Sequence, residues 1–565
     1  MRACVLIAVL LCGFIRPVSA EIVKRLHVRI PMRDGVELAA NIFLPSESMR
    51  FPVILVRTPY SKGADLAPTF RPFLNHGYAM VIEDVRGRYE SGGSFDPLSE
   101  EPGDPDDTLN WIARQPWSDG KIGMIGGSYL GIAQWKAALV NNPHLKAISP
   151  AVSGDDEYRD RYYSTGGAFQ LGHRLLWMAE NLRVPGFEEP AFDRYVRTLP
   201  LRQADFAATG QHCDIFQKAL NHPGDDAFWR SVSTRDHLAS IHVPVFSVGG
   251  WYDPFVESDF AAFSALRRNS GVHRIVIGPW PHNMAIKFDR VDFGKDSGAP
   301  IRRMQIEWFD QWLKSKDTAM MSQPPVHLFV MGINRWRDEN EWPLARTRMT
   351  RLYFAGRGRA NTLAGDGMLL GRSPRQAAPD RFEFDPRNPV PTTGGANCCN
   401  PKVFPWGPMD QRAVERRQDV LVFSSPPLKQ DLEVTGPVSV VVYAATSAPD
   451  TDFTAKLVDV FPDGEARNLT DGVLRLRYRN SLEKPELARP GEIYKLTIDA
   501  GVTSNVFLKG HRVRVEVSSS NFPRYDRNPN TGRPIADENV LRKAEQTIYH
   551  DRAHPSHVLL PVIPN

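Results

Sequence analysis

The sequence predicts an α/β protein with a helical insertion and a separate all-β C-terminal domain. Short apolar runs alternate with segments of helical spacing in residues 21–154 and again in residues 239–322, a pattern typical of a mostly parallel sheet with helices on both faces. Between these two stretches, residues 155–238 carry helical spacing with many charges and lack strand signals. In residues 323–565, short strand-like segments between Gly, Pro and Asp turns predict a β-sandwich or jelly roll.

The first twenty residues have the pattern of a secretory signal peptide. Arg2 supplies the positive start, residues 3–15 are apolar, and Val18-Ser19-Ala20 is a small-residue cleavage site. No later run is long and apolar enough to span a bilayer. We therefore expect an exported protein, periplasmic or secreted, with no stable membrane span in its mature form; an uncleaved N-terminal anchor is the alternative.

The first part of the core is expected to open with a hairpin and to continue with buried strands. Arg33-Asp34-Gly35 is a turn signal between the strand-like residues 26–30 and 36–43. Apolar runs then predict buried parallel strands, and helical spacing predicts two helices. The strands are expected at 53–56, 79–82, 122–125 and 147–151, and the helices at 107–114 and 129–140.

The insertion and the second part of the core follow the same reasoning. Helical spacing within the insertion falls on residues 168–181, 192–198 and 215–219. Alternation then resumes with strands at 243–248 and 273–277 and helices at 258–266 and 302–314. The strand-to-helix rhythm on both sides of the insertion predicts that residues 21–154 and 239–322 build one sheet and that residues 155–238 form a cap.

In the C-terminal region, apolar and polar residues alternate with a period of two. Val513, Val515 and Val517 are separated by charged residues, and residues 438–443 are similarly patterned. Residues 374–405 are rich in Pro, Gly and Asn, and we expect a long surface loop there.

Charge and cysteine content exclude several classes of protein. The formal net charge is only +4, whereas nucleic-acid binding usually requires a concentrated basic face. No nucleic-acid partner is therefore expected. After the predicted cleavage three cysteines remain, Cys213, Cys398 and Cys399, and either a disulfide or three free thiols fits them. Cys-x-x-Cys spacing does not occur, and no metal site is expected.

Ser128 stands where a predicted strand turns into a predicted helix. The sequence there is Gly126-Gly127-Ser128-Tyr129-Leu130-Gly131. This is the context of the nucleophile elbow of α/β-hydrolases, a sharp turn that lifts the serine Oγ clear of the sheet. Leu130 occupies the place of the second glycine of the strict Gly-x-Ser-x-Gly pattern, and Gly131 follows one position later.

Candidate partners of Ser128 follow two later strands in the chain order acid, then histidine. Asp253 comes just after residues 243–248, and His282 just after residues 273–277. The carboxyl ends of parallel strands meet at one edge of the sheet, where α/β proteins place their sites. A serine hydroxyl needs an imidazole to take its proton, and a carboxylate fixes the imidazole tautomer. The sequence therefore predicts a catalytic triad of Ser128, Asp253 and His282.

Several motifs along the chain resemble the CocE/NonD hydrolase family, which includes cocaine esterase-like enzymes and is related to Xaa-Pro dipeptidyl peptidases and α-amino acid ester hydrolases. The motifs include Arg57-Thr58-Pro59-Tyr60, the stretch from Pro116-Trp117 to Gly123, the Ser128 elbow, Gly250-Trp251-Tyr252-Asp253 and Gly278-Pro279-Trp280 before His282. Further matches in the C-terminal region extend the resemblance over nearly all of the mature chain.

The resemblance implies an α/β-hydrolase core, a helical cap and a C-terminal jelly roll. It also implies an oxyanion hole made by the Tyr60 hydroxyl and the backbone N–H of Tyr129, and it places Phe255 in the acyl pocket. A serine elbow followed by Tyr and then by Gly three positions after the serine is this family's own form. No metal or organic cofactor is implied.

The expected function is hydrolysis of a carboxylic ester or amide through an acyl-enzyme, as in a cocaine esterase-like acyl esterase. The expected partner is a small ester, amide or short peptide substrate, and a homo-oligomer is left open. Alternatives within the class are an Xaa-Pro dipeptidyl peptidase, an α-amino acid ester hydrolase and a β-lactam acylase. A dipeptidyl peptidase needs an acidic anchor in the cap, for which Asp155, Asp156 and Glu157 are candidates. The alternative from another class is a non-catalytic binding protein that uses the β-sandwich.

Overall fold

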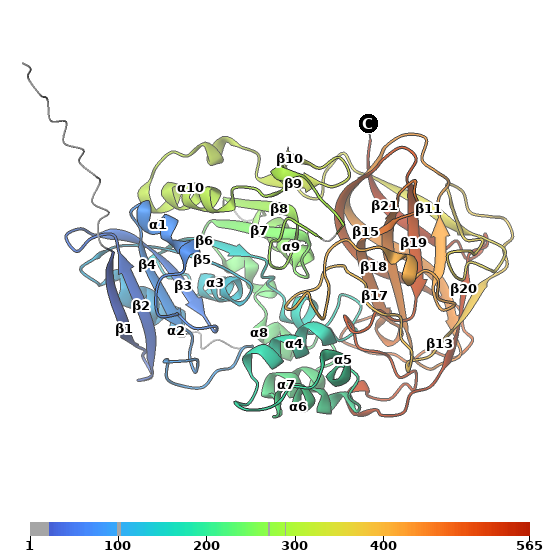
Figure 1. Cartoon of the computed structure of the whole chain (residues 1–565), viewed down its shortest axis with the longest axis horizontal. Coiled ribbons are helices and arrows are strands. Elements are labelled where there is room, and N and C mark those ends of the chain that lie inside the picture. Colours follow the sequence, from blue (N-terminus) through green and yellow to red (C-terminus); the bar gives the residue numbers. More distant parts are fainter. Residues whose placement is uncertain (1–21, 99–102, 269–271, 289, 565) are drawn as a thin grey trace, which may run out of the picture.

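The computed structural model describes residues 22–98, 103–268, 272–288 and 290–564, so the predicted signal peptide lies outside the described residues. Figure 1 shows three parts: an α/β core at one end, a β-rich domain at the other, and a group of helices beside both. This arrangement confirms the predicted fold class of an α/β core with a helical cap and a C-terminal all-β domain.

Ten strands form the core sheet in the order β1-β2-β4-β3-β5-β6-β7-β8-β9-β10. The run from β4 through β3 to β9 is parallel, and β1, β2 and β10 add antiparallel edges. The strands are β1 (Val23–Pro31), β2 (Glu37–Leu44), β3 (Phe51–Thr58), β4 (Ala79–Asp84), β5 (Ser118–Gly127), β6 (Leu145–Ala151), β7 (Val245–Tyr252), β8 (His273–Pro281), β9 (Val326–Val330) and β10 (Arg335–Glu339). The predicted hairpin and buried strands are confirmed.

Helices cover both faces of this sheet because its central strands are apolar on both sides. Ile122 and Met124 of β5 pack in the same cluster as α2 (Gly103–Ala113), α3 (Tyr129–Leu139) and α9 (Val256–Leu266). Ile125 of β5 and Ile54 of β3 pack instead with α1 (Arg71–Asn75) and α10 (Ile301–Lys314). A strand buried on both faces reads as a continuous apolar run, which is why these strands were recognisable from the sequence.

The cap is a set of short helices between β6 and β7 (Figure 1). They are η2 (Glu157–Tyr162), α4 (Leu171–Asn181), α5 (Phe192–Tyr195), η3 (Leu201–Gln203), α6 (Ala204–Thr209), α7 (Asp214–Asn221), α8 (Ala227–Val232) and η4 (Arg235–Ser240). The cap core is rich in aromatic rings and also takes in Tyr129 from the α/β core and Phe404 and Phe522 from the C-terminal domain. The three parts therefore meet in one buried cluster next to the predicted nucleophile.

The C-terminal domain is an 11-stranded, predominantly antiparallel sheet in the order β13-β20-β15-β21-β11-β12-β14-β19-β16-β17, with β18 paired to β15. Its strands are β11 (Arg348–Ala355), β12 (Met368–Leu370), β13 (Asp380–Phe384), β14 (Leu421–Ser424), β15 (Leu432–Thr446), β16 (Asp452–Val460), β17 (Ala466–Arg475), β18 (Tyr494–Phe507), β19 (Arg512–Ser518), β20 (Ala544–Tyr549) and β21 (His557–Ile563). Further single-turn helices connect the elements: η1 (Pro68–Phe70), η5 (Lys295–Ser297), η6 (Ala319–Ser322), η7 (Gln411–Ala413), η8 (Leu476–Tyr478) and η9 (Ile535–Asp537).

Two expectations about the C-terminal half need correction. The predicted boundary between residues 322 and 323 falls before β9 and β10, which extend the core sheet. The change of sheet therefore comes after Glu339, because β9 pairs in parallel with β8. Residues 374–405 are not a surface loop throughout, since they contain β13 and a buried Asn397 whose Nδ2 donates to the carbonyls of Gly394 and Pro405.

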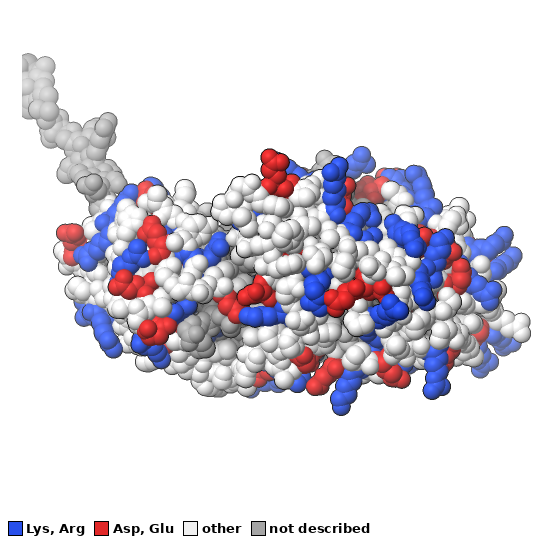
Figure 2. Space-filling model, turned by 90° about the horizontal axis from the view of Figure 1, so that it is seen from below, with Lys and Arg blue, Asp and Glu red and all other residues white. Residues whose placement is uncertain are grey.

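Charge is balanced locally on the face seen from below. Figure 2 shows positive and negative side chains interspersed there.

Within the described ranges, none of the helices combines the length and the apolar character needed to cross a bilayer.

Candidate active site

Ser128 lies at the junction of β5 and α3 in a strained backbone conformation. Its φ is 58° and its ψ is −127°, a region that non-glycine residues rarely adopt. The turn is held by the Ser128 N–H, which donates to the Ala151 carbonyl at 2.9 Å. Gly126, at φ +149°, makes room for Leu130, since a Cβ on Gly126 would lie 2.4 Å from the Leu130 Cβ. This is the geometry of a nucleophile elbow.

Asp253 and His282 follow directly after β7 and β8, two neighbouring parallel strands. The carboxyl ends of β7 and β8 lie at the same edge of the sheet as the carboxyl end of β5. His282 Nε2 lies 3.0 Å from Ser128 Oγ, and His282 Nδ1 lies 2.6 Å from Asp253 Oδ2. Asp253 is fully buried, and its other carboxylate oxygen accepts the Phe255 N–H at 2.9 Å. The three residues thus form a continuous hydrogen-bonded line from hydroxyl to carboxylate.

The electrostatics of His282 fit a base that can hold a proton. Burial lowers the pKa of His282, but the Asp253 carboxylate and its hydrogen bond outweigh burial, so the pKa is raised from its ordinary value. The Phe255 ring stands 5.5 Å from the His282 ring, centroid to centroid, and is itself buried. Phe255 therefore shields the imidazole from water and restricts its orientation.

Tyr60 follows β3 and reaches the same edge of the sheet. The Trp177 Nε1–H donates to its hydroxyl at 3.0 Å. Burial raises the pKa of Tyr60 above its ordinary value, although contacts with Trp177 and the Ser128 side chain lower it. Tyr60 is therefore a neutral phenol with a proton to donate. Arg88 holds this loop in place by donating to the carbonyls of Pro59 at 2.9 Å and Asn181 at 3.1 Å.

Tyr129 supplies the first backbone N–H of α3, at the end of the helix that carries partial positive charge. Its side chain is buried under Trp177, with the ring planes stacked at 6.5 Å between centroids. An oxygen placed between the Tyr60 hydroxyl and this end of α3 would meet two donors of the kind that stabilise an oxyanion.

A pocket of about 290 Å³ opens over Ser128. It brings together five of the six predicted site residues, Tyr60, Ser128, Tyr129, Phe255 and His282, while Asp253 lies behind His282. The remaining lining residues are Ile132, Arg161, Arg174, Trp177, Glu180, Asn181, Cys398 and Cys399. The pocket is therefore built by the core, the cap and a loop of the C-terminal domain.

The cap and loop residues of this wall could not be identified from the sequence. Arg161, Arg174 and Trp177 come from the cap, where helical spacing alone does not say which side chains face the nucleophile. Cys398 and Cys399 lie more than a hundred residues from His282 along the chain, and their Sγ atoms are 2.7 Å apart. The adjacent pair was visible in the sequence, but nothing in its spacing indicated the pocket. Cys213 instead stays buried in the cap beside Thr209.

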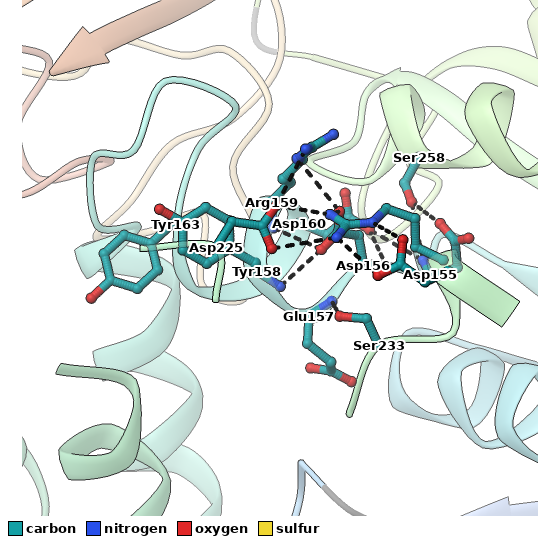
Figure 3. A network of polar contacts seen from close by, with 12 residues as sticks. Asp155, Asp156, Glu157, Tyr158, Arg159, Asp160, Tyr163, Asp225, Ser233 and Ser258 are labelled. Carbon is teal, nitrogen blue, oxygen red and sulfur yellow. Dashed lines mark hydrogen bonds and ion pairs between the residues drawn. The ribbon is translucent and has the colours of Figure 1, made fainter. Parts of the chain in front are cut away.

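The acidic residues at the start of the cap are engaged with one another and with the core (Figure 3). The Ser258 hydroxyl of α9 donates to Asp155, and Asp156 accepts the Tyr158 N–H at 3.0 Å. Glu157 pairs with Arg161 at 2.7 Å. Burial raises the pKa of Asp155 to about 7. The Asp155 contact fastens the cap to the core, and none of the three candidate anchors lines the pocket over Ser128.

Glu180 is the carboxylate that does line this pocket. It lies on α4 at the exposed end of the wall. Burial and the neighbouring Glu189 raise its pKa from the ordinary value.

Among the described residues, no group of His, Cys, Asp and Glu side chains is arranged to hold a metal ion.

Comparison with known proteins identifies both halves of the chain. Residues 34–284 match the X-Pro dipeptidyl-peptidase (S15 family) model, and residues 318–559 match the model of the X-Pro dipeptidyl-peptidase C-terminal non-catalytic domain. The chain is 41% identical over 569 residues to cocaine esterase of Rhodococcus sp. (strain MB1 Bresler), covering 95% of this chain and 98% of that protein.

Two solved structures superpose over almost the whole molecule. An α-amino acid ester hydrolase matches with a TM-score of 0.86 and 27% identity, over 96% of this chain and 97% of that one. An aminopeptidase from a marine sediment archaeon, Thaumarchaeota archaeon, matches with a TM-score of 0.86, 27% identity and the same coverage. The chain therefore belongs to the CocE/NonD family of serine hydrolases, with an S15-type catalytic domain joined to a C-terminal non-catalytic domain.

Proposed function

We propose that this protein hydrolyses a carboxylic ester through an acyl-enzyme formed on Ser128. The observation that carries the proposal is the hydrogen-bonded line from Ser128 through His282 to Asp253, with distances of 3.0 and 2.6 Å. An ester substrate is favoured over an amide because the identity to cocaine esterase, at 41%, exceeds the 27% to the aminopeptidase.

Each residue has a distinct part in the reaction. Ser128 Oγ attacks the scissile carbonyl while His282 Nε2 takes the hydroxyl proton, and His282 then gives that proton to the leaving alkoxide. Asp253 holds His282 in the tautomer with Nδ1 protonated and stabilises the imidazolium. The Tyr60 hydroxyl and the Tyr129 N–H hold the oxyanion. Water, activated by His282, then cleaves the acyl-enzyme to the free acid and restores Ser128.

Labelling with a fluorophosphonate probe tests the assignment of the nucleophile. The mature protein is expected to be labelled once, and Ser128→Ala is expected to lose both the label and ester hydrolysis. Ser94→Ala, in a polar loop of the same domain, is the control and should keep both. Equal labelling of wild type and Ser128→Ala would disprove the proposal.

A second candidate function is cleavage of substrates with a free amino group, as in amino acid esters or short peptides. Glu180 favours it, because its carboxylate lies in the cap wall where an ammonium group could pair with it. A panel of acyl esters, amino acid esters and Xaa-Pro amides separates the two candidates. We expect acyl esters to give the highest kcat/KM.

We also propose that the protein is exported and loses residues 1–20. The support is the positive start, apolar stretch and small-residue cleavage site of the N-terminus. N-terminal sequencing of the protein recovered outside the cytoplasm should give Glu21 as the first residue. Recovery of the chain with Met1 intact would contradict the proposal.

A further inference from the structure

Arg174 is a buried guanidinium in the wall of the active-site pocket. It lies on α4, is 4% exposed and lines the pocket together with Ser128 and His282. In the described part of the chain, no Asp or Glu oxygen lies within 4.0 Å of its side-chain nitrogen atoms. Its Nε has no hydrogen-bond acceptor. A positive charge thus faces the pocket without a counterion from the protein.

The other buried arginines of the described chain are all provided with acceptors. Arg274 donates to the backbone carbonyls of Gln323 and Pro324. The rest have carboxylate partners: Arg57 with Glu83, Arg161 with Glu157, Arg475 with Asp452 and Asp526, Arg514 with Glu415, and Arg524 with Asp471. Arg174 departs from this pattern in the wall of the pocket that contains Ser128.

Neither Tyr162 nor Glu180 supplies a negative charge in contact with Arg174. Its guanidinium carbon stands 5.4 Å from the centroid of the Tyr162 ring, but a cation–π contact stabilises a charge less than its burial costs. Burial raises the pKa of Tyr162 to about 12, so that neighbour is uncharged. Glu180 lies on the same helix but at the exposed end of the pocket, and it forms no ion pair with Arg174. A buried charge of this kind calls for an anion from outside the chain.

We propose that Arg174 recognises a carboxylate on the acyl group that Ser128 receives, so that the preferred substrates are half-esters of short dicarboxylic acids. The proposal deepens the proposed function and rests on it. A guanidinium binds a carboxylate through two parallel hydrogen bonds, and it does so most strongly where water is excluded. A pocket of about 290 Å³ limits the acyl group to a short chain or a single ring.

A matched pair of substrates tests the proposal. The 4-nitrophenyl esters of pentanoic acid and of glutaric acid (as the half-ester) differ by a terminal methyl against a carboxylate at the same chain position. We expect the wild-type kcat/KM to be higher for the glutarate half-ester by on the order of 10- to 100-fold, the range expected for charge-assisted hydrogen bonds. Free glutarate should inhibit hydrolysis of the pentanoate ester competitively.

Arg174→Gln should remove this preference. We expect its kcat/KM to fall by on the order of tenfold or more for the glutarate half-ester, mainly through KM, and its inhibition by glutarate to weaken equally. Its kcat/KM for the pentanoate ester, compared on the pH plateau above the acid limb, should fall far less than that for the glutarate half-ester, and a circular dichroism spectrum matching the wild type should show that the variant is folded. Arg174→Lys should recover part of the preference. The control is Arg183→Gln, an exposed cap arginine paired with Glu189, which should behave as wild type.

Two results would overturn the proposal. One is equal or better hydrolysis of the pentanoate ester by the wild type, and the other is an equal loss on both esters in Arg174→Gln. A third arm compares acetate esters of phenol and of 3-carboxyphenol, which carry the anion on the leaving group. If the enzyme preferred the carboxylate only when it is on the leaving group, the proposal that Arg174 binds a carboxylate on the acyl group would be contradicted. Failure of the proposed function itself is distinct, because then neither ester would be hydrolysed and no fluorophosphonate label would appear.

Discussion

Gly131 lies so close to Ser153 that a Cβ on residue 131 would stand 2.4 Å from the Ser153 Cβ and 2.6 Å from its Oγ. Gly131 is in the first turn of α3, and Ser153 follows the end of β6. The helix that begins at the nucleophile therefore crosses the neighbouring strand end at this point. The glycine that stands one position later than in the strict elbow pattern is required by that crossing.

Gly131→Ala should displace α3 and with it the elbow. Overpacking of this kind costs about 1–3 kcal/mol of unfolding free energy. We expect a lower unfolding temperature together with a reduced kcat, because the Ser128 Oγ moves relative to His282. The control is Gly371→Ala, where a new Cβ meets nothing within 4 Å. Wild-type stability and kcat in Gly131→Ala would contradict the packing argument.

Loss of the Tyr60 hydroxyl should affect kcat much more than KM. Removing one oxyanion donor typically costs about 10²- to 10³-fold in kcat, and Tyr60→Phe leaves the rest of the ring in place. Trp177→Phe removes the 3.0 Å hydrogen bond to the Tyr60 hydroxyl and should cost less, because the donor itself remains. Steady-state kinetics check both, with the exposed Tyr89→Phe as the control. An effect of Tyr60→Phe on KM alone would argue for substrate binding instead.

The acid limb of kcat/KM against pH should report His282. The imidazole must be neutral to accept the Ser128 proton, so activity is lost as pH falls through its pKa. Asp253 raises this pKa, which places the limb above about 6.5, the ordinary value for histidine. Asp253→Asn should therefore shift the limb to lower pH and reduce kcat by about 10⁴-fold through the wrong tautomer.

Removing the charge of Arg174 should shift the acid limb in the opposite direction. Its positive charge lowers the pKa of His282, so Arg174→Gln should move the acid limb of pentanoate ester hydrolysis to higher pH. A limb that moves the same way in both variants would contradict this electrostatic picture.

The cysteine pair in the pocket should make the enzyme sensitive to trivalent arsenicals. Cys398 and Cys399 hold their Sγ atoms 2.7 Å apart beside the catalytic residues. Phenylarsine oxide condenses with two neighbouring thiols, with loss of water, and would place a phenyl group in the pocket. We expect inhibition that a dithiol reverses and that Cys399→Ser abolishes, measured by ester hydrolysis. Cys213→Ser, in the cap, should leave the inhibition unchanged, and persistent inhibition of Cys399→Ser would disprove the assignment.

Features of this protein that depend on short stretches of chain can be predicted from the amino-acid sequence. Apolar runs predict the buried strands, because a strand covered on both faces has no polar side. Ser128, Asp253 and His282 were predictable because each directly follows a strand of one parallel sheet, and such strands end at a common edge. The resemblance to a known family added Tyr60, Tyr129 and Phe255, which spacing alone does not identify.

The residues that complete the pocket, and the point where one sheet ends and the other begins, depend on contacts between distant parts of the chain. Strands β9 and β10 have the same local pattern as those of the C-terminal domain, and their membership in the core sheet follows from pairing with β8. Arg174 and Cys398 belong to the cap and to a distant loop, and they reach Ser128 through packing around the shared aromatic cluster. Local periodicity predicts that a residue is buried, but it does not predict which neighbours bury it. The position of Arg174 in the pocket, without a carboxylate partner, therefore follows only from the packing of all three parts of the protein.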